Sequence, residues 1–154
     1  MTVSAADFRR ALGSWPSGVT VVTTRADQTY SSPHGITVSA FVSVSMDPPL
    51  ILISIGNAAT ALGRIREAAA FTVNILTQGQ DAVSNRFAGR PTEGPVPITA
   101  DGAIEGALAV LQCRVEQEVG GGDHTLFIGR VEEVVVNDGA PLVYWRGKYR
   151  GLTE

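Results

Sequence analysis

Five consecutive residues, Gly120-Gly121-Gly122-Asp123-His124, combine a flexible backbone, a carboxylate and an imidazole just before an apolar segment. The glycines permit close approach of a ligand, and an aspartate tolerates turns and bonds local amides. An imidazole at the start of a strand would project from a barrel rim, where it could stack on an aromatic ligand or donate a proton near neutral pH. On its own, the stretch is better explained as a hairpin turn that carries an incidental histidine.

A second candidate is a run of hydroxyl side chains, Thr37, Ser39, Ser43 and Ser45, separated by apolar residues. Alternate residues of a strand share a face, so a kink near Ala40-Phe41 would bring these hydroxyls into one polar row. Such a row, with exposed amides, suits hydrogen bonding to a flat polar heterocycle or a phosphate. Hydroxyls on a solvent-facing strand would give the same pattern, and the pattern alone favours that simpler interpretation.

Two further positions could contact a ligand. Ser54 lies near the end of an apolar strand and is followed by Gly56-Asn57, which places a hydroxyl beside a glycine that allows close approach. A buried serine bonded to backbone explains this equally well. Arg86 stands near the expected end of a helix, where its planar guanidinium could pair with a phosphate. A lone arginine on a helix is usually a solvated surface residue.

The sequence argues against several other kinds of site. No serine lies in a G-x-S-x-G elbow, so a catalytic triad is not indicated. His34 and His124 with scattered acids give no recognisable metal-ligand spacing. The single cysteine, Cys113, excludes an intrachain disulfide and a cysteine-based metal cluster. We therefore expect no metal.

The composition is that of an ordinary globular protein, with 154 residues, 44% hydrophobic and 18% charged residues, and a net charge of −3. Without a basic cluster, a nucleic-acid footprint is not supported. No apolar run approaches the ~20 residues of a membrane span, and the N-terminal residues lack the apolar segment of a signal peptide. We expect a single domain over residues 1–154 of a cytoplasmic protein, with no nucleic-acid or membrane partner.

The candidate residues must be positioned by many strands and a few peripheral helices. Ser4 with Asp7 three positions later resembles a helix start. Asn57 is expected to cap a helix that carries Leu62 and Ile65, and Thr77 to Gln80 to open another helix as a capping box. Strands are expected at residues 19–24, 34–39, 50–55, 71–75, 109–116, 126–136 and 141–145, the third buried on both faces and the fifth with Cys113 inward.

The order of these elements indicates the fold class. Regular βαβ alternation is absent and no G-x-G-x-x-G follows a strand, which argues against a doubly wound nucleotide-binding fold. We expect a mainly β fold, an antiparallel barrel with peripheral helices. Residues 89–102, rich in Pro and Gly, are expected to form a surface loop, and residues 147–151 to turn away after the last strand.

Taken in order, the segments resemble the short-chain flavin reductases of the split-barrel type, the reductase partners of two-component flavin-dependent monooxygenases. The individual motifs are modest, but together they cover nearly the whole chain. The matching stretches are Phe8–Leu12, Trp15–Thr24, Gly35–Phe41, Ser43–Leu50, Phe71–Leu76, Arg86–Gly89, Gly122–Val131 and Pro141–Tyr144.

This resemblance implies a split antiparallel β-barrel and a homodimer that reduces FMN or FAD with NADH or NADPH and supplies reduced flavin to a monooxygenase. The flavin-binding residues that it implies are Ser17, Thr37, Val38, Ser39, Ala40, Ser43, Ser45, Ser54, Asn57, Ser84, Arg86 and Phe87. Those implied on the nicotinamide side are Gly122, Asp123, His124 and Tyr149. His124 would orient the nicotinamide or stabilise charge rather than abstract a proton.

One departure bears on the cofactor. Members of the family often carry Met-Thr-Ala-Asn-Ser where this chain has Ile36 to Ala40, so Ser39 replaces an amide and Ala40 lacks a hydroxyl. The choice between FMN and FAD therefore stays open, as does that between NADH and NADPH. Two rival functions are a split-barrel oxidase of the pyridoxine-phosphate type, which would need a clear basic phosphate cluster, and a flavin-binding or electron-carrying module without nicotinamide turnover.

Overall fold

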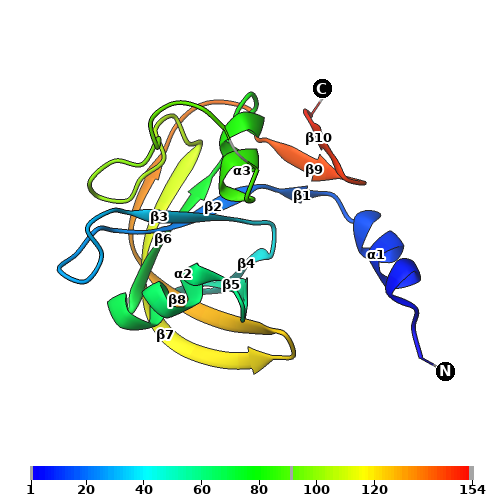
Figure 1. Ribbon diagram of the computed structural model, residues 1–154, viewed down its shortest axis with the longest axis horizontal. Helices are drawn as coiled ribbons and strands as arrows, with labels where there is room; N and C mark the ends of the chain where they lie inside the picture. The colour runs from blue at the N-terminus through cyan, green and yellow to red at the C-terminus, as the bar shows by residue number, and fades with distance from the viewer. Residues whose placement is uncertain (1, 91, 153–154) are drawn as a thin grey trace.

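The computed structural model describes residues 2–90 and 92–152, and its centre is one antiparallel sheet of seven strands in the order β3-β2-β6-β7-β8-β5-β4 (Figure 1). The strands are β2 (Thr20–Thr24), β3 (His34–Val38), β4 (Phe41–Met46), β5 (Pro49–Gly56), β6 (Ala70–Ile75), β7 (Ala109–Gly121) and β8 (His124–Val136). The edge strands β3 and β4 are consecutive in the chain. Their short connection, Ser39-Ala40, therefore brings the two edges of the curled sheet together, and the expected split antiparallel barrel is confirmed.

The remaining elements are three helices and a small second sheet, and α1 projects away from the barrel (Figure 1). They are α1 (Ala5–Gly13), α2 (Thr60–Ala68), α3 (Asp81–Phe87), and the strands β1 (Ser17–Gly18), β9 (Val143–Trp145) and β10 (Lys148–Arg150). The Ser4 cap is confirmed, since its hydroxyl accepts a hydrogen bond from the Asp7 amide at 3.0 Å. Residues 148–150 do not turn away as expected. They pair with β9, where Tyr149 lies opposite Tyr144.

The main core lies inside the barrel and is closed by α2. Leu62 and Ile65 of this helix pack in one cluster with Ile53, Phe71 and Phe127 from the sheet. Cys113 joins this cluster and is 4% exposed, as expected. The prediction that the strand at 50–55 is buried on both faces was wrong, because only Ile51, Ile53 and Ile55 are buried and the alternate residues are partly exposed.

The expected starts of two helices were also wrong. Helix α2 begins at Thr60 with Ala59 as an N-cap that gives no side-chain hydrogen bond, because the Asn57 side chain is engaged elsewhere. Helix α3 begins at Asp81. The Gln80 side chain does accept from the Thr77 amide at 3.0 Å, but the Thr77 hydroxyl donates to the Ala140 carbonyl at 2.9 Å instead of capping the helix. One of the two hydrogen bonds of a capping box is therefore formed, but it lies before the first residue of the helix.

Candidate functional site

The first part of the candidate site is a cavity of about 200 Å³ between the end of β3 and helix α3. The Thr37 hydroxyl donates to the Ser84 carbonyl at 2.6 Å and thereby joins β3 to α3. The Tyr149 hydroxyl donates to Ser84 Oγ at 2.8 Å and lies 3.0 Å from Asn85 Oδ1, so β10 is tied to the same helix. The lining residues are Val19, Thr37, Ser39, Ser84, Asn85, Ala88, Arg90, Tyr144 and Tyr149.

The four hydroxyls of Thr37, Ser39, Ser43 and Ser45 do not form one row, in agreement with the simpler interpretation of the pattern. Thr37 and Ser39 line this cavity, whereas Ser43 and Ser45 lie on edge strand β4. A β-bulge between them places Ser43 opposite Ile51 and Ser45 opposite its neighbour on β5, so the two hydroxyls leave the strand on opposite faces. The bulge could not be read from an alternating pattern.

Two other implied flavin residues do not line this cavity. The Val38 side chain is 5% exposed and belongs to the barrel core, and its carbonyl accepts from the Thr20 hydroxyl at 2.6 Å. Ser17 lies on β1 opposite Tyr144 and does not line the cavity itself.

A second cavity, of about 630 Å³, adjoins the first and shares Thr37 and Ala88 with it. Its walls are β3, the beginning of α2 and the end of α3. Helix α2 has no side-chain cap, and its Leu62 amide donates to the Ala59 carbonyl at 3.1 Å. The amides of Thr60 and Ala61 and the positive end of the helix dipole therefore suit an anion. The lining residues are His34, Gly35, Ile36, Thr37, Ala58, Ala59, Thr60, Arg86, Phe87, Ala88 and Gly89.

Arg86 and Phe87 shape this second cavity. The Arg86 guanidinium donates to the Pro95 carbonyl at 2.7 Å and to the Gly94 carbonyl at 2.9 Å, so it anchors the following loop as well as facing the cavity. The Phe87 ring lies against Gly35, where a Cβ atom would come within 2.7 Å of the ring. Glycine is therefore required for this close packing.

His124 lies at the other end of the candidate site, at the tip of the β7–β8 hairpin. Gly122 has φ +73°, and the turn Gly122-Asp123 reverses the chain. Asp123 Oδ1 is 2.7 Å from His124 Nδ1. The pKa of Asp123 is lowered, first by this hydrogen bond and then by the nearby imidazole charge. The carboxylate orients the ring through Nδ1 and leaves Nε2 as the nitrogen that can meet a ligand.

Asn57 locks the hairpin tip onto the end of β5. Its amide group donates from Nδ2 to the Gly122 carbonyl at 3.2 Å, and its Oδ1 accepts from the Thr125 hydroxyl at 2.7 Å. Its backbone amide donates to the Asp123 carbonyl at 2.9 Å. Asn57 is therefore engaged in positioning the Gly-Asp-His turn, which sequence reasoning missed.

Strand register places the imidazole and the β3–β4 connection on one face of the sheet. His124 lies opposite Gly56. Two residues earlier on β5, the Ser54 amide donates to the Ala40 carbonyl at 3.1 Å. Strand spacings of ~4.8 Å and ~3.4 Å per residue put Ala40 and His124 about 12 Å apart along this face. Ser54 lies between them on the same outward face and is partly exposed.

Tyr149 does not join His124 as the resemblance implied. It lies with Ser84 on the α3 side of the site, and Figure 1 shows β10 and the tip of the β7–β8 hairpin at different ends of the barrel. Five lining residues of the first cavity were missed: the apolar Val19 and Ala88, and the polar or aromatic Asn85, Arg90 and Tyr144. Asn85 and Arg90 flank the Ser84-Arg86 segment that the sequence singled out, but the pairing of Tyr144 with Tyr149 at 5.4 Å between ring centroids depends on the small sheet.

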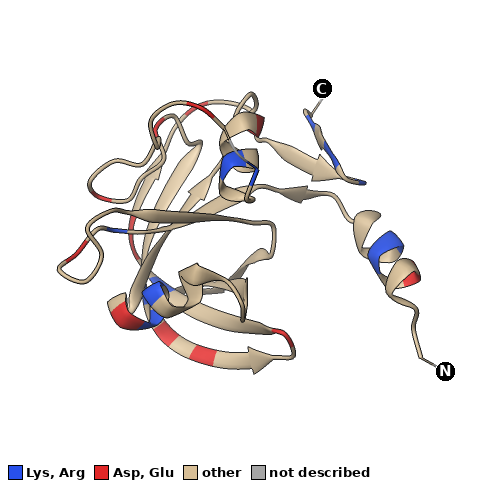
Figure 2. Ribbon diagram, in the orientation of Figure 1, with Lys and Arg blue, Asp and Glu red and all other residues tan. Residues whose placement is uncertain are grey.

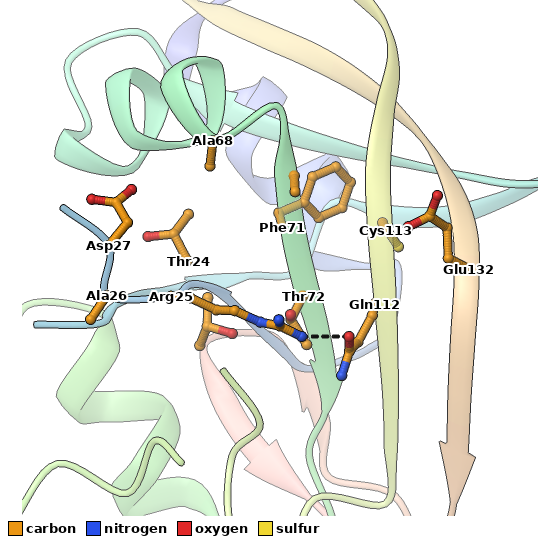
Figure 3. A pocket seen from close by; sticks show the side chains of 12 residues that line it. Thr24, Arg25, Ala26, Asp27, Ala68, Phe71, Thr72, Gln112, Cys113 and Glu132 are labelled. Atoms are coloured by element: carbon orange, nitrogen blue, oxygen red, sulfur yellow. Dashed lines mark hydrogen bonds between the residues drawn. The ribbon is translucent and has the colours of Figure 1, made fainter. Parts of the chain in front are cut away.

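Another cavity, of about 370 Å³, lies where β2, β6, β7 and β8 meet the end of α2 and contains none of the predicted site residues (Figure 3). Burial, and secondarily Glu132, raises the pKa of its Cys113 thiol to about 12, so this sulfur is neutral at ordinary pH. Within residues 2–90 and 92–152, no three His, Cys, Asp or Glu side chains are grouped so that they could hold a metal ion. None of the helices in this part of the chain is long and apolar enough to cross a membrane.

Comparisons with known proteins agree with this geometry. The sequence matches the family described as "Flavin reductase like domain" over residues 12–153. The reductase component of 4-hydroxyphenylacetate 3-monooxygenase from Thermus thermophilus is 44% identical over 94% of this chain and 95% of its own length. An NADH-dependent flavin reductase from a Rhodococcus species is 42% identical over 97% of this chain and 88% of its own length.

A solved structure supports the same relationship. Flavin reductase PheA2 matches with a TM-score of 0.91 and 40% identity, over 99% of this chain and 100% of that one. Sequence and fold therefore agree across almost the whole chain, and the chain belongs to the flavin reductase-like family.

Proposed function

We propose that the two adjoining cavities and the His124 face form one flavin and nicotinamide site. The protein is an NAD(P)H:flavin oxidoreductase that reduces FMN or FAD and supplies reduced flavin to a monooxygenase. The observation that carries the placement is the shared face of Ala40, Ser54 and His124. Ala40 directly follows Ser39, which lines the cavity beside α3.

The residues present fit a flavin. The uncapped start of α2 and Arg86 border the larger cavity, and both suit a phosphate group. Above Gly56, a Cβ atom would meet only His124 Nε2, at 3.8 Å, so the surface there is low enough for a flat ring. The isoalloxazine ring would lie along Ser39 to Phe41, with the phosphate toward Thr60.

The protein contributes placement and electrostatics. A bound flavin supplies the hydride-accepting chemistry. Asp123 fixes the orientation of the imidazole, and Nε2 of His124 would then hold the nicotinamide carboxamide or stabilise charge beside the ring. Close alignment of two rings can lower a barrier by ~7–11 kcal/mol. No side chain needs to act as a nucleophile or a base in this arrangement.

The protein is also proposed to act as a homodimer. Exposed apolar side chains gather on α1 and β4, with Leu12 57% and Met46 92% exposed. Apolar surface of this kind marks interaction sites. We further propose that residues 1–154 form one domain, since a shared sheet carries both core clusters. We also propose that the protein acts in the cytoplasm, where reduced nicotinamide nucleotides are available.

A direct assay tests the proposed function. Purified protein is mixed with FMN or FAD and with NADH or NADPH, and the loss of nicotinamide absorbance is followed. Rapid loss that requires both flavin and protein is expected. Indifference to nicotinamide would instead identify a flavin carrier, and oxidation of pyridoxine phosphate without nicotinamide would identify an oxidase.

A further inference from the structure

Helix α2 carries a buried positive charge, Arg64, which is 6% exposed. Its Nη2 donates to the Ser32 carbonyl at 2.6 Å, and its guanidinium carbon lies 4.0 Å from the centroid of the Tyr30 ring. Within residues 2–90 and 92–152, its Nε has no hydrogen-bond partner and no carboxylate lies within ion-pair distance of it. A buried charge without a counter-charge is costly to a fold, so Arg64 calls for a role beyond packing.

The groups that do contact Arg64 are neutral. The Tyr30 ring offers its face, and Ser32 offers a backbone carbonyl. The nearby Glu67 carboxylate is bonded to the Tyr30 hydroxyl, and this hydrogen bond raises the pKa of that tyrosine. A cation above an aromatic ring is stabilised by the charge distribution of the ring but keeps its own charge. The guanidinium therefore remains an uncompensated charge inside the protein.

Arg64 lies behind the wall of the larger cavity, the one between β3, α2 and α3. It follows Thr60 by four residues, which places their Cβ atoms ~5–6 Å apart on one side of the helix, and Thr60 lines that cavity. The Ser32 carbonyl is only two residues before His34, which lines the cavity as well. After burial, the charge of Arg64 is the second cause that lowers the pKa of His34, so this charge acts on the cavity wall.

The surroundings of this cavity favour an anion. Arg86 and the start of α2 line it, and none of its lining residues in the described part of the chain is Asp or Glu. Figure 2 shows Lys and Arg positions on both α2 and α3, while acidic positions lie along the β7–β8 hairpin. Because Arg64 is shielded from water, its field reaches the cavity through protein, where solvent and salt weaken it less.

A phosphate group responds most strongly to such a field. A phosphate monoester carries about −1.5 to −2 charges at pH 7, whereas the ring and ribityl chain of an oxidised flavin are uncharged. Arg64 is not among the residues that line the cavity. It therefore acts on a bound phosphate through its charge, behind the groups that can make contact, such as Arg86 and the first amides of α2.

We propose that Arg64 is a positioning residue that sets the preference of the site for phosphorylated flavins over riboflavin, by stabilising the flavin phosphate from behind the cavity wall. This inference rests on the proposed flavin site. A purely structural role, in which Arg64 only anchors the segment with Tyr30 and Ser32, predicts a different result. Loss of the anchor would weaken every flavin alike, while loss of the charge weakens only the phosphorylated one.

Fluorescence titration with FMN and with riboflavin tests this role. Arg64→Met removes the charge but keeps a long side chain against Tyr30. It should raise the dissociation constant for FMN roughly tenfold, the effect of one charge ~10 Å away at an effective dielectric constant of ~20. The constant for riboflavin should change less than about twofold. Arg66→Met is the matched control on the same helix, since the Arg66 side chain is 49% exposed and paired with Glu118, and both constants should stay unchanged.

A second variant guards against disturbance of the segment that Arg64 anchors. Arg64→Gln keeps an N–H donor for the Ser32 carbonyl and should show the same selective loss of FMN affinity. Equal losses for FMN and riboflavin, or unchanged FMN affinity, would overturn the role of Arg64. NADH oxidation by the wild-type protein with FMN reports the reductase function separately. A wild type that binds flavin and oxidises NADH therefore leaves that function intact whatever the variants show.

Discussion

At the residue scale, the proposed chemistry depends on how Asp123 and Asn57 hold His124. The Asp123 carboxylate lies at hydrogen-bond distance from Nδ1 of the imidazole. The Asn57 side chain holds the same turn by donating a hydrogen bond to the Gly122 carbonyl. Since the imidazole is about half exposed, its orientation comes from these contacts and not from burial.

Replacing His124 by Ala should slow hydride transfer by ~10–100-fold, the range expected when a bound ring loses its orientation. Flavin affinity should change by less than about threefold, because other parts of the site hold the phosphate and the ribityl chain. Stopped-flow reduction of bound flavin by NADH measures the first quantity and fluorescence titration the second. An unchanged reduction rate would remove His124 from the nicotinamide side.

Replacing Arg86 by Ala should raise the flavin dissociation constant by ~10–100-fold, as expected for a lost charged hydrogen bond of ~1.5–3 kcal/mol. Arg86 also holds the Gly94 and Pro95 carbonyls, so loop disorder is an alternative cause. Arg86→Lys separates the two. A lysine keeps the charge but loses the planar fork, and it should recover part of the affinity only if phosphate binding is the cause.

At the element scale, the long β7–β8 hairpin must curve around the core, and Gly129 permits this. A Cβ atom at Gly129 would lie 2.5 Å from Phe71 Cζ and 3.2 Å from Cys113 Cβ. Phe71 and Cys113 are 3% and 4% exposed, so neither can move into solvent.

Gly129→Ala should therefore lower the free energy of unfolding by ~1–3 kcal/mol, the usual cost of overpacking a core. Gly120→Ala in the same hairpin is the matched control, because a Cβ there meets nothing within 4 Å. Urea denaturation of the three proteins checks this. Phe71→Leu should restore part of the loss in the Gly129→Ala background, and equal stability of the two alanine variants would contradict the clash.

The elements that follow from local patterns were predictable, and those that depend on tertiary contacts were not. Alternation placed Cys113 inward, and the Ser4 cap started α1 as expected. Asn57 failed as a helix cap because the hairpin tip, distant in sequence, provides it with better partners. The hydroxyls of Thr37 to Ser45 do not form one row because a bulge in β4 turns Ser43 and Ser45 to opposite faces. The segments that form the candidate site were predicted only from the resemblance to the family, because each motif taken alone was explained at least as well by ordinary structure.

At the scale of the whole molecule, the curled sheet brings together residues that no single element could hold. The connection between β3 and β4 closes the barrel at the site, and α2 seals the core while directing its N-terminus into the larger cavity. His34 lines this cavity, and the positive charge of Arg64 on α2 acts on its imidazole. Protonation of His34 should therefore change both the charge of the cavity wall and the stability of the fold.

Burial, and then the positive charge of Arg64, lowers the pKa of His34 below its ordinary value of 6.5. As the pH falls through 6.5, the unfolded chain gains a proton at this position that the folded chain does not accept until a lower pH. The free energy of unfolding should therefore fall with decreasing pH from 6.5 down to the lowered pKa. Asp101 and Asp123 also have lowered pKa values, but they start from 3.8 and titrate in a more acidic range.

The test compares the wild-type protein with His34→Asn, which keeps a polar side chain but cannot titrate. Urea denaturation at closely spaced pH values from 7.5 to about 5 should show a steeper loss of stability for the wild type than for the variant. Above pH 7 the two profiles should run parallel, since His34 is neutral in both the folded and unfolded states there. Parallel profiles across the whole range would mean that folding does not change the proton affinity of this imidazole, and the link between the cavity wall and stability would be rejected.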